Sequence, residues 1–371
     1  MFSPRRPPPV DCVCDFTVSP APAPPWSRPA RPAHPVPTVT NILIVGPAWV
    51  GDMVLAQCLF KAIRRADPAA RITVLAPAWS APLVERMPEV AKLVRMPLGH
   101  GEFKLRARYR LGRELRARRF ARAIVLPGSF KSALPPWFAR IPRRTGYVGE
   151  QRWGLLNDIR RSPKVTPPPV TARRFVALGR DKDAPEVDEI PRPALTVDSA
   201  AAQETAARFG LDAGAAAVAL CPGAEYGPAK QWPAAHFAAV AAAQLQRGRP
   251  VWIFGSAKDR AAAADINRRC AGRCADLTGR TTLGEAVDLL SLARHTVTND
   301  SGLMHIAAAV GSHVIALYGS SSDTVTPPLT PRAHPLNLRL DCSPCFHRAC
   351  PLGHTNCLNH LSPDRVLAVM E

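Results

Sequence analysis

The chain has 371 residues, a formal net charge of +19 at pH 7 and a sequence pI near 10.3. This length suffices for two domains with substantial cores, and no apolar run reaches the roughly 18 residues of a transmembrane helix. The charge indicates an anionic partner: nucleic acid, an acidic membrane surface or a polyanionic substrate. Ten cysteines in a chain this long do not form the dense pattern of a small secreted disulfide scaffold, which favours a reducing compartment.

Residues 1–38 form a leader rich in Pro and Ala, without hydrophobic periodicity. This composition is typical of a disordered or polyproline-like segment. It lacks the continuous apolar stretch of a signal peptide, so we exclude it from the fold and do not infer secretion.

Short apolar runs then alternate with helical patterns up to about residue 127. The runs expected as buried parallel strands are 41–46, 71–76, 92–96 and 123–127, and the helices are 53–65, 80–87 and 105–119. This alternation is typical of a doubly wound α/β domain, which we place at 39–190. The Pro-rich passage 162–193 should hold the domain connection, although 171–178 looks helical.

A second α/β block follows at 191–345, with a Cys-containing tail at 346–371 that ends in a helix over 362–370. Its expected strands are 216–223, 250–255, 274–277, a strand ending at 295–298, and 312–319; its expected helices are 233–246, 259–271, 283–292 and one stopped by Gly311. Two such blocks place a ligand at the carboxyl ends of their strands.

Three turns at predicted strand ends carry chemical groups. Asp52 stands at a helix start, where it could act as a general base or merely cap the helix. Lys230 lies on a Gly/Pro-rich loop, where it could meet a pyrophosphate or remain a solvated cation. The first turn is not GxGxxG and no acidic residue follows the second strand, which disfavours a nicotinamide dehydrogenase.

The third turn is Asn299 to Gly302. Asp300 and Ser301 are expected N-caps of the following helix, whose free backbone N–H groups could bind a phosphate. An ordinary strand–helix crossover explains the turn equally well. On an adjacent strand end, Asp259 could receive ribose hydroxyls or cap its own helix.

Five segments in this order carry a family resemblance: NILIVGPAWVGDMVLAQ, PGAEYGPAKQWP, FGSAKD, LTGRTTLGEA and NDSGLMHIAAAVG. Together they resemble the ADP-heptose:lipopolysaccharide heptosyltransferases of glycosyltransferase family 9, within them the heptosyltransferase II branch. The resemblance runs from about Asn41 to the C-terminus. It implies a GT-B fold, two Rossmann-like domains facing across a cleft, with the acceptor in the first domain and the sugar nucleotide held mainly by the second.

The resemblance also implies residue roles. Asp52 corresponds to the family's catalytic base and Lys230 to the lysine that steadies the donor pyrophosphate. The positions that it places around the donor are Asp259, Thr278, Gly279, Asp300, Ser301, Gly302 and His305. For His305 a satisfied buried histidine is an equal alternative. The implied reaction is an inverting transfer of L-glycero-D-manno-heptose from ADP-heptose to the first heptose of heptosyl-Kdo2-lipid A, without a cofactor.

Basic residues are concentrated between 101 and 161, and their position suggests a role for the positive charge of the chain. Arg106, Arg110, Arg143 and Arg144 are the expected contacts to the phosphorylated inner-core acceptor. Such a surface would also hold the enzyme at the anionic inner face of the inner membrane, on the cytoplasmic side. A solvated basic helix is the alternative. Nucleic acid is disfavoured because no stacking aromatics are interleaved with these arginines.

Four cysteines near the C-terminus, Cys342, Cys345, Cys350 and Cys357, have metal-ligand chemistry and spacing. A zinc or cluster site is open, but the resemblance assigns them no metal, and we expect none. Two other functions also remain open: heptosyltransferase I or III with a different acceptor, and a non-catalytic sugar-nucleotide-binding protein at the membrane surface.

Overall fold

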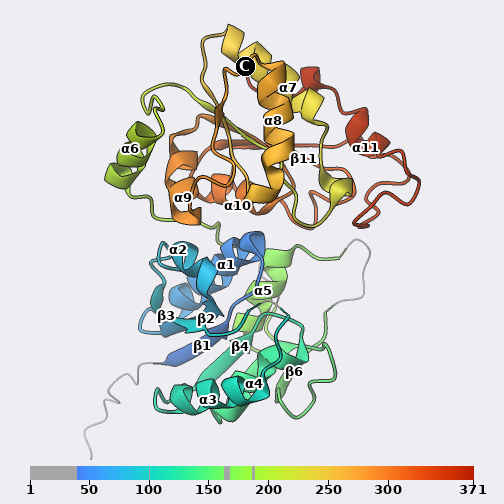
Figure 1. Cartoon of the computed structure of the whole chain (residues 1–371). Helices are drawn as coiled ribbons and strands as arrows, with labels where there is room; N and C mark the ends of the chain where they lie inside the picture. The colour runs from blue at the N-terminus through green and yellow to red at the C-terminus, as the bar shows by residue number, and fades with distance from the viewer. Residues whose placement is uncertain (1–39, 100, 163–167, 186–188) are drawn as a thin grey trace, which may run out of the picture. The chain divides into compact units, whose positions relative to one another are not determined.

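The computed structural model describes residues 40–99, 101–162, 168–185 and 189–371. The leader expected at 1–38 lies outside them. The described residues form two parallel six-stranded sheets, ordered β3-β2-β1-β4-β5-β6 and β12-β11-β10-β7-β8-β9, with helices on their faces (Figure 1). The α/β prediction is therefore confirmed. The proposed domain boundaries at 190 and 345 stay predictions.

The first sheet consists of β1 (Asn41–Val45), β2 (Arg71–Pro77), β3 (Val90–Met96), β4 (Arg122–Val125), β5 (Arg143–Tyr147) and β6 (Asp158–Arg160). Its helices are α1 (Val50–Ala66), α2 (Ala81–Val84), α3 (Leu105–Arg116), α4 (Phe130–Phe138) and α5 (Thr171–Gly179). Alternate side chains of β1 enter different apolar clusters: Ile42 and Ile44 pack with α1 and α5, whereas Leu43 and Val45 pack with α3 and α4. Both faces of the sheet are therefore covered, as the continuous apolar runs predicted.

The second sheet consists of β7 (Val218–Cys221), β8 (Val251–Ile253), β9 (Ala275–Asp276), β10 (His295–Asn299), β11 (His313–Leu317) and β12 (Ala333–Leu336). Its helices are α6 (Ser199–Arg208), α7 (Ala234–Gln246), α8 (Arg260–Arg269), α9 (Leu283–Leu292), α10 (Gly302–Ala309), α11 (Asn356–Asn359) and α12 (Pro363–Ala368), with short 3-10 turns η2 (Pro228–Lys230) and η3 (Ala257–Asp259). Within the described ranges, no helix is long and apolar enough to cross a bilayer.

Several elements differ from the sequence prediction. The helix expected at 80–87 is a 3-10 turn, η1 (Ala78–Ser80), followed by the four residues of α2. Helix α4 was not predicted because it contains Pro135 and Pro136, which normally interrupt helices. Strands β5, β6 and β12 were missed because they are short and polar or contain proline, so they lack an apolar run.

The strand order places three turns at the carboxyl edges of the sheets. Asp52 follows β1, Lys230 follows β7 and Asp300 follows β10, and all three strands are interior to their sheets. Helix α1 packs against both α5 and α10. At the start of α10, a Cβ atom on Gly302 would lie 2.7 Å from Cβ of Val50. The absence of a side chain on Gly302 therefore lets the first turns of α1 and α10 meet.

Candidate active site

Lys230 and Asp300 form an ion pair at the turn that follows β10. The Lys230 ammonium lies 2.5 Å from Oδ2 of Asp300, which is only 6% exposed. The Thr326 hydroxyl lies 3.4 Å from both carboxylate oxygens of Asp300. Lys230 is therefore not the freely solvated loop cation that the sequence left open.

Asn299 holds these two turns in register. Its side-chain oxygen accepts a hydrogen bond from the backbone N–H of Trp232 at 3.0 Å, and its side-chain nitrogen donates to the carbonyl of Pro222 at 2.7 Å. Both ends of the Lys230 loop are thus bonded to the residue before Asp300. Sequence reasoning assigned Asn299 no role, although it stands inside a quoted motif.

Asp52 lies in the first turn of α1, whose N-cap is Trp49. The alternative that Asp52 is the N-cap of this helix is therefore wrong. Burial and the nearby charge of Asp300 raise the pKa of Asp52 to about 6, while Lys230 and Arg174 act in the opposite direction. A carboxylate with a raised pKa at the end of an interior strand is suited to accept a proton near neutral pH.

His305 lies in the second turn of α10 and is 5% exposed. Burial lowers its pKa to about 4, so the imidazole is neutral near pH 7. Its Nδ1 is buried without a hydrogen-bond partner among the described residues. The structure brings His305 against Gly51, next to Asp52.

The turn before α10 is capped differently from the expectation. Ser301 is the N-cap residue but makes no side-chain capping hydrogen bond, and Asp300 pairs with Lys230 instead of capping. The expectation that Asp300 caps the helix is therefore wrong. No side chain caps the first backbone N–H groups of α10, which begins at Gly302. These N–H groups lie at the positive end of the helix dipole, where an anion is stabilised.

Asp259, Thr278 and Gly279 lie together at the carboxyl ends of β8 and β9. Asp259 accepts hydrogen bonds from the backbone N–H and hydroxyl of Ser256 at 2.7 and 2.8 Å in the capping box of η3, whose N-cap is Ser256. Asp259 is the N-cap residue of α8 but makes no side-chain capping hydrogen bond to that helix, so its position as N-cap is confirmed and its side-chain cap is not. The hydroxyl of Thr278 bonds Asp276 at 2.6 Å. Gly279 has a φ of +64° and donates its N–H to Gly255, a conformation that favours glycine. Their contacts to a nucleotide stay predictions.

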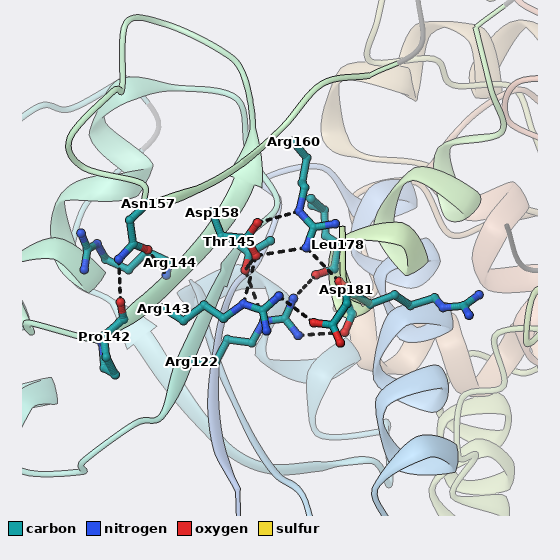
Figure 2. A network of polar contacts seen from close by, with 12 residues as sticks. Arg122, Pro142, Arg143, Arg144, Thr145, Asn157, Asp158, Arg160, Leu178 and Asp181 are labelled. Carbon is teal, nitrogen blue, oxygen red and sulfur yellow. Dashed lines mark hydrogen bonds and ion pairs between the residues drawn. The ribbon is translucent and has the colours of Figure 1, made fainter. Parts of the chain in front are cut away.

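Of the four expected acceptor contacts, Arg106 and Arg110 are exposed in the first turns of α3. Arg143 and Arg144 begin β5, at the amino edge of the sheet, opposite the edge that carries Asp52. In Figure 2, Arg143 contacts Asp158 and Asp181. Arg144 donates to the carbonyls of Leu155 and Ile141. The structure therefore does not bring Arg143 or Arg144 to the catalytic turn.

Two further residues near the site were missed by sequence reasoning. Arg174 on α5 acts on the pKa of Asp52, and its guanidinium carbon lies 5.2 Å from the ring centroid of Tyr147. Thr171, at the start of the same helix, donates its N–H to Val325, next to the Thr326 that contacts Asp300. No local pattern in the Pro-rich passage before α5 indicates this placement.

The four cysteines near the C-terminus line one pocket together with His354 and Ser320. Across the ranges that the structure describes, no three or more His, Cys, Asp or Glu side chains are arranged to hold a metal ion. The same pocket is lined by Ala229, the neighbour of Lys230. The cysteine segment thus borders the Lys230 loop.

Comparison with known proteins identifies the family. The model of glycosyltransferase family 9 (heptosyltransferase) matches residues 108–356. Lipooligosaccharide heptosyltransferase 2 of Haemophilus influenzae is 47% identical over 304 residues, 79% of this chain and 87% of that protein. Lipopolysaccharide heptosyltransferase 2 of Escherichia coli is 43% identical over 336 residues, 88% of this chain and 96% of that protein.

The fold agrees with the sequence relatives. The structure of E. coli ADP-heptose lps heptosyltransferase II superposes with a TM-score of 0.78 and 40% identity, covering 89% of this chain and 97% of that one. The two parallel sheets are thus those of a GT-B glycosyltransferase. The chain belongs to glycosyltransferase family 9, the heptosyltransferases.

Proposed function

We propose that this enzyme transfers L-glycero-D-manno-heptose from ADP-heptose to the first heptose of the lipopolysaccharide inner core, with Asp52 as the base. One observation carries the proposal: Asp52, whose pKa is raised, lies close enough to the Lys230–Asp300 ion pair at the start of α10 for both of those charges to act on it. Asp52 is suited to take a proton, and Lys230 can stabilise the negative charge on a leaving group. The names of the relatives supply the sugar and the donor.

In the proposed step, the acceptor hydroxyl loses its proton to Asp52 while its oxygen bonds the anomeric carbon of the donor. The bond from that carbon to the diphosphate oxygen breaks, and ADP leaves from the opposite face, so the configuration inverts. Lys230 and the uncapped N–H groups of α10 stabilise the charge that collects on the diphosphate. His305, which lies beside Gly51, is neutral and adds no positive charge to the turn before α10. Among the predicted site residues, Lys230 is therefore the cation closest to that turn.

The acceptor is expected on the first sheet's side. Arg106 and Arg110 are exposed on α3, and Phe103 and Tyr109 are exposed beside them. Basic and aromatic side chains together suit an anionic lipid surface. We therefore place the enzyme at the cytoplasmic face of the inner membrane, with a phosphorylated lipid acceptor.

The double variant Arg106→Gln/Arg110→Gln tests this surface. It should bind vesicles of zwitterionic and anionic phospholipid more weakly and raise the KM for the lipid acceptor about thirtyfold, since each of the two cations near such a surface contributes about 1 kcal/mol. The KM for the donor should not change. Arg65→Gln, an exposed arginine in the last turn of α1, is the matched control. Unchanged vesicle binding and acceptor KM would reject the surface.

An acceptor series tests the proposed reaction itself. The enzyme is incubated with ADP-heptose and Kdo2-lipid A acceptors that carry no, one or two heptoses, and the products are identified by mass spectrometry. We expect one heptose to be added only to the acceptor that already carries one. Addition to the acceptor without heptose would indicate heptosyltransferase I activity, and addition to the acceptor with two would indicate heptosyltransferase III activity. No product with any acceptor would reject the proposed reaction.

A further inference from the structure

Tyr226, in the loop after β7, lies next to two cations. Nζ of Lys230 is 5.0 Å from its ring centroid, and the guanidinium carbon of Arg348 is 5.2 Å from the same centroid. The hydroxyl of Tyr226 donates to the carbonyl of Phe346 at 2.8 Å, a further contact between this loop and the C-terminal segment. An aromatic ring attracts cations through its electron-rich face, so Tyr226 interacts favourably with both side chains.

The backbone around Arg348 supports the same loop. The N–H of Ala229 donates to the carbonyl of Arg348 at 3.1 Å. A Cβ atom on Gly227 would lie 2.4 Å from that oxygen, so only glycine allows the approach. On its other side, the segment is anchored by Phe346, whose N–H donates to the carbonyl of Ser320 at 2.6 Å. The C-terminal segment that contains Phe346 and Arg348 is therefore in direct contact with the loop that carries Lys230.

The charges near this ring are not balanced. Lys230 pairs with Asp300, but Arg348 is exposed, and no described carboxylate lies within ion-pair distance of it. The nearby Glu225 is paired with Lys258. Two cations beside one ring repel each other, and an anion between them removes that repulsion. A guanidinium matches phosphate oxygens particularly well, because it can donate two parallel hydrogen bonds.

We propose that Tyr226 is a positioning residue that holds Lys230 and Arg348 side by side, and that Arg348 joins Lys230 in binding the diphosphate of the donor. The proposal rests on the donor site of the proposed function. It extends that site to the C-terminal segment, for which the sequence indicated no role in catalysis. Tyr226 acts through the two cations and does not itself contact the nucleotide.

Calorimetric titration of the full-length protein with ADP, AMP and inorganic diphosphate tests the proposal. Arg348→Gln should weaken ADP and diphosphate binding about tenfold, as expected for a lost charged hydrogen bond, and AMP binding less. Tyr226→Leu should weaken ADP binding to a similar degree. Tyr226→Phe should stay within about twofold of the wild type, because the ring remains. Arg332→Gln, an exposed arginine just before β12, is the charge-matched control.

The outcomes separate this proposal from the proposed function. Unchanged ADP affinity in Arg348→Gln would overturn the role of Arg348, and unchanged affinity in Tyr226→Leu would overturn the positioning role. Arg348 is exposed, so its variant keeps the proposal testable even where Tyr226→Leu fails to fold. A wild type that binds neither ADP nor diphosphate overturns the proposal outright. A wild type that shows the expected ADP pattern but transfers no heptose rejects only the proposed reaction.

Discussion

Gly51 and His305 lie in direct contact, because a Cβ atom on Gly51 would fall 2.7 Å from Cδ2 of His305. Gly51 precedes Asp52 in the first turn of α1, and His305 belongs to α10, whose first turn follows Asp300. The contact thus sets the distance between the turn that carries the proposed base and the turn that carries the proposed diphosphate site. The glycine is required by this close approach, since its φ is not in the left-handed region.

Gly51→Ala should therefore separate the two turns. His305 is buried and cannot move away freely, so we expect overpacking to lower the free energy of unfolding by about 1–3 kcal/mol. We also expect kcat/KM for transfer to fall more than about tenfold, because small displacements of catalytic groups are costly. Gly128→Ala is the control, since a Cβ atom there would meet no atom within 4 Å. A Gly51→Ala enzyme as active as the Gly128→Ala enzyme would show that the contact does not set the active geometry.

The pH dependence of transfer should report the ionisation of Asp52. Burial and Asp300 raise its pKa to about 6, and a base must be ionised, so kcat/KM should fall as the pH decreases through about 6. Arg174 lowers this pKa, so Arg174→Gln should move the acid limb to higher pH, whereas Arg174→Lys should leave it near its original place. His305, in contact with Gly51, has a pKa of about 4 and does not titrate in this range. An acid limb that is identical in wild type and Arg174→Gln would contradict the assignment.

Asp52→Asn should separate catalysis from stability. The pKa of Asp52 is about 6 in the folded protein and 3.8 ordinarily, so the folded state binds this proton more tightly. The ionised carboxylate therefore destabilises the folded state. This destabilisation is absent below pH 3.8 and complete above about pH 6, where it amounts to at most about 3 kcal/mol.

At pH 7.5 the Asp52→Asn protein should accordingly unfold at a higher denaturant concentration than the wild type, while its kcat falls by about two to four orders of magnitude. ADP binding, measured by calorimetry, should persist. The pH series supplies the control, because the difference in unfolding free energy should shrink between pH 6 and pH 4. Retained transfer by this variant would remove Asp52 from the role of base.

The sequence predicted the elements and turns that have local patterns. Apolar runs identified every interior strand of the second sheet and, in the first sheet, every interior strand except β5. The residues that follow these strands supplied Asp52, Lys230 and Asp300. The capping of α10 was not predictable, because the choice of Asp300 between capping and pairing with Lys230 depends on a residue 70 positions away. Arg143 and Arg144 illustrate the same limit. Their charge suggested an acceptor contact, but only the strand β5, which has no apolar run, determines which edge of the sheet they occupy.

The last prediction concerns the ion pair of Arg86 and Asp288. Arg86 follows α2 and Asp288 lies on α9, with side chains 21% and 4% exposed, and Asp288 also accepts the N–H of Asp198 at 3.3 Å. The pair joins a helix beside the first sheet to one beside the second. Removing one partner of a buried pair leaves an uncompensated charge, so Asp288→Ala should lower the free energy of unfolding by about 3 kcal/mol in urea titrations. Arg268→Gln, which breaks the exposed pair with Asp265, should cost less than about 1 kcal/mol. An equal loss of unfolding free energy in the two variants would contradict this prediction. It would mean that Arg86 is solvated once Asp288 is removed, so that the pair is not a stabilising contact between the two halves of the chain.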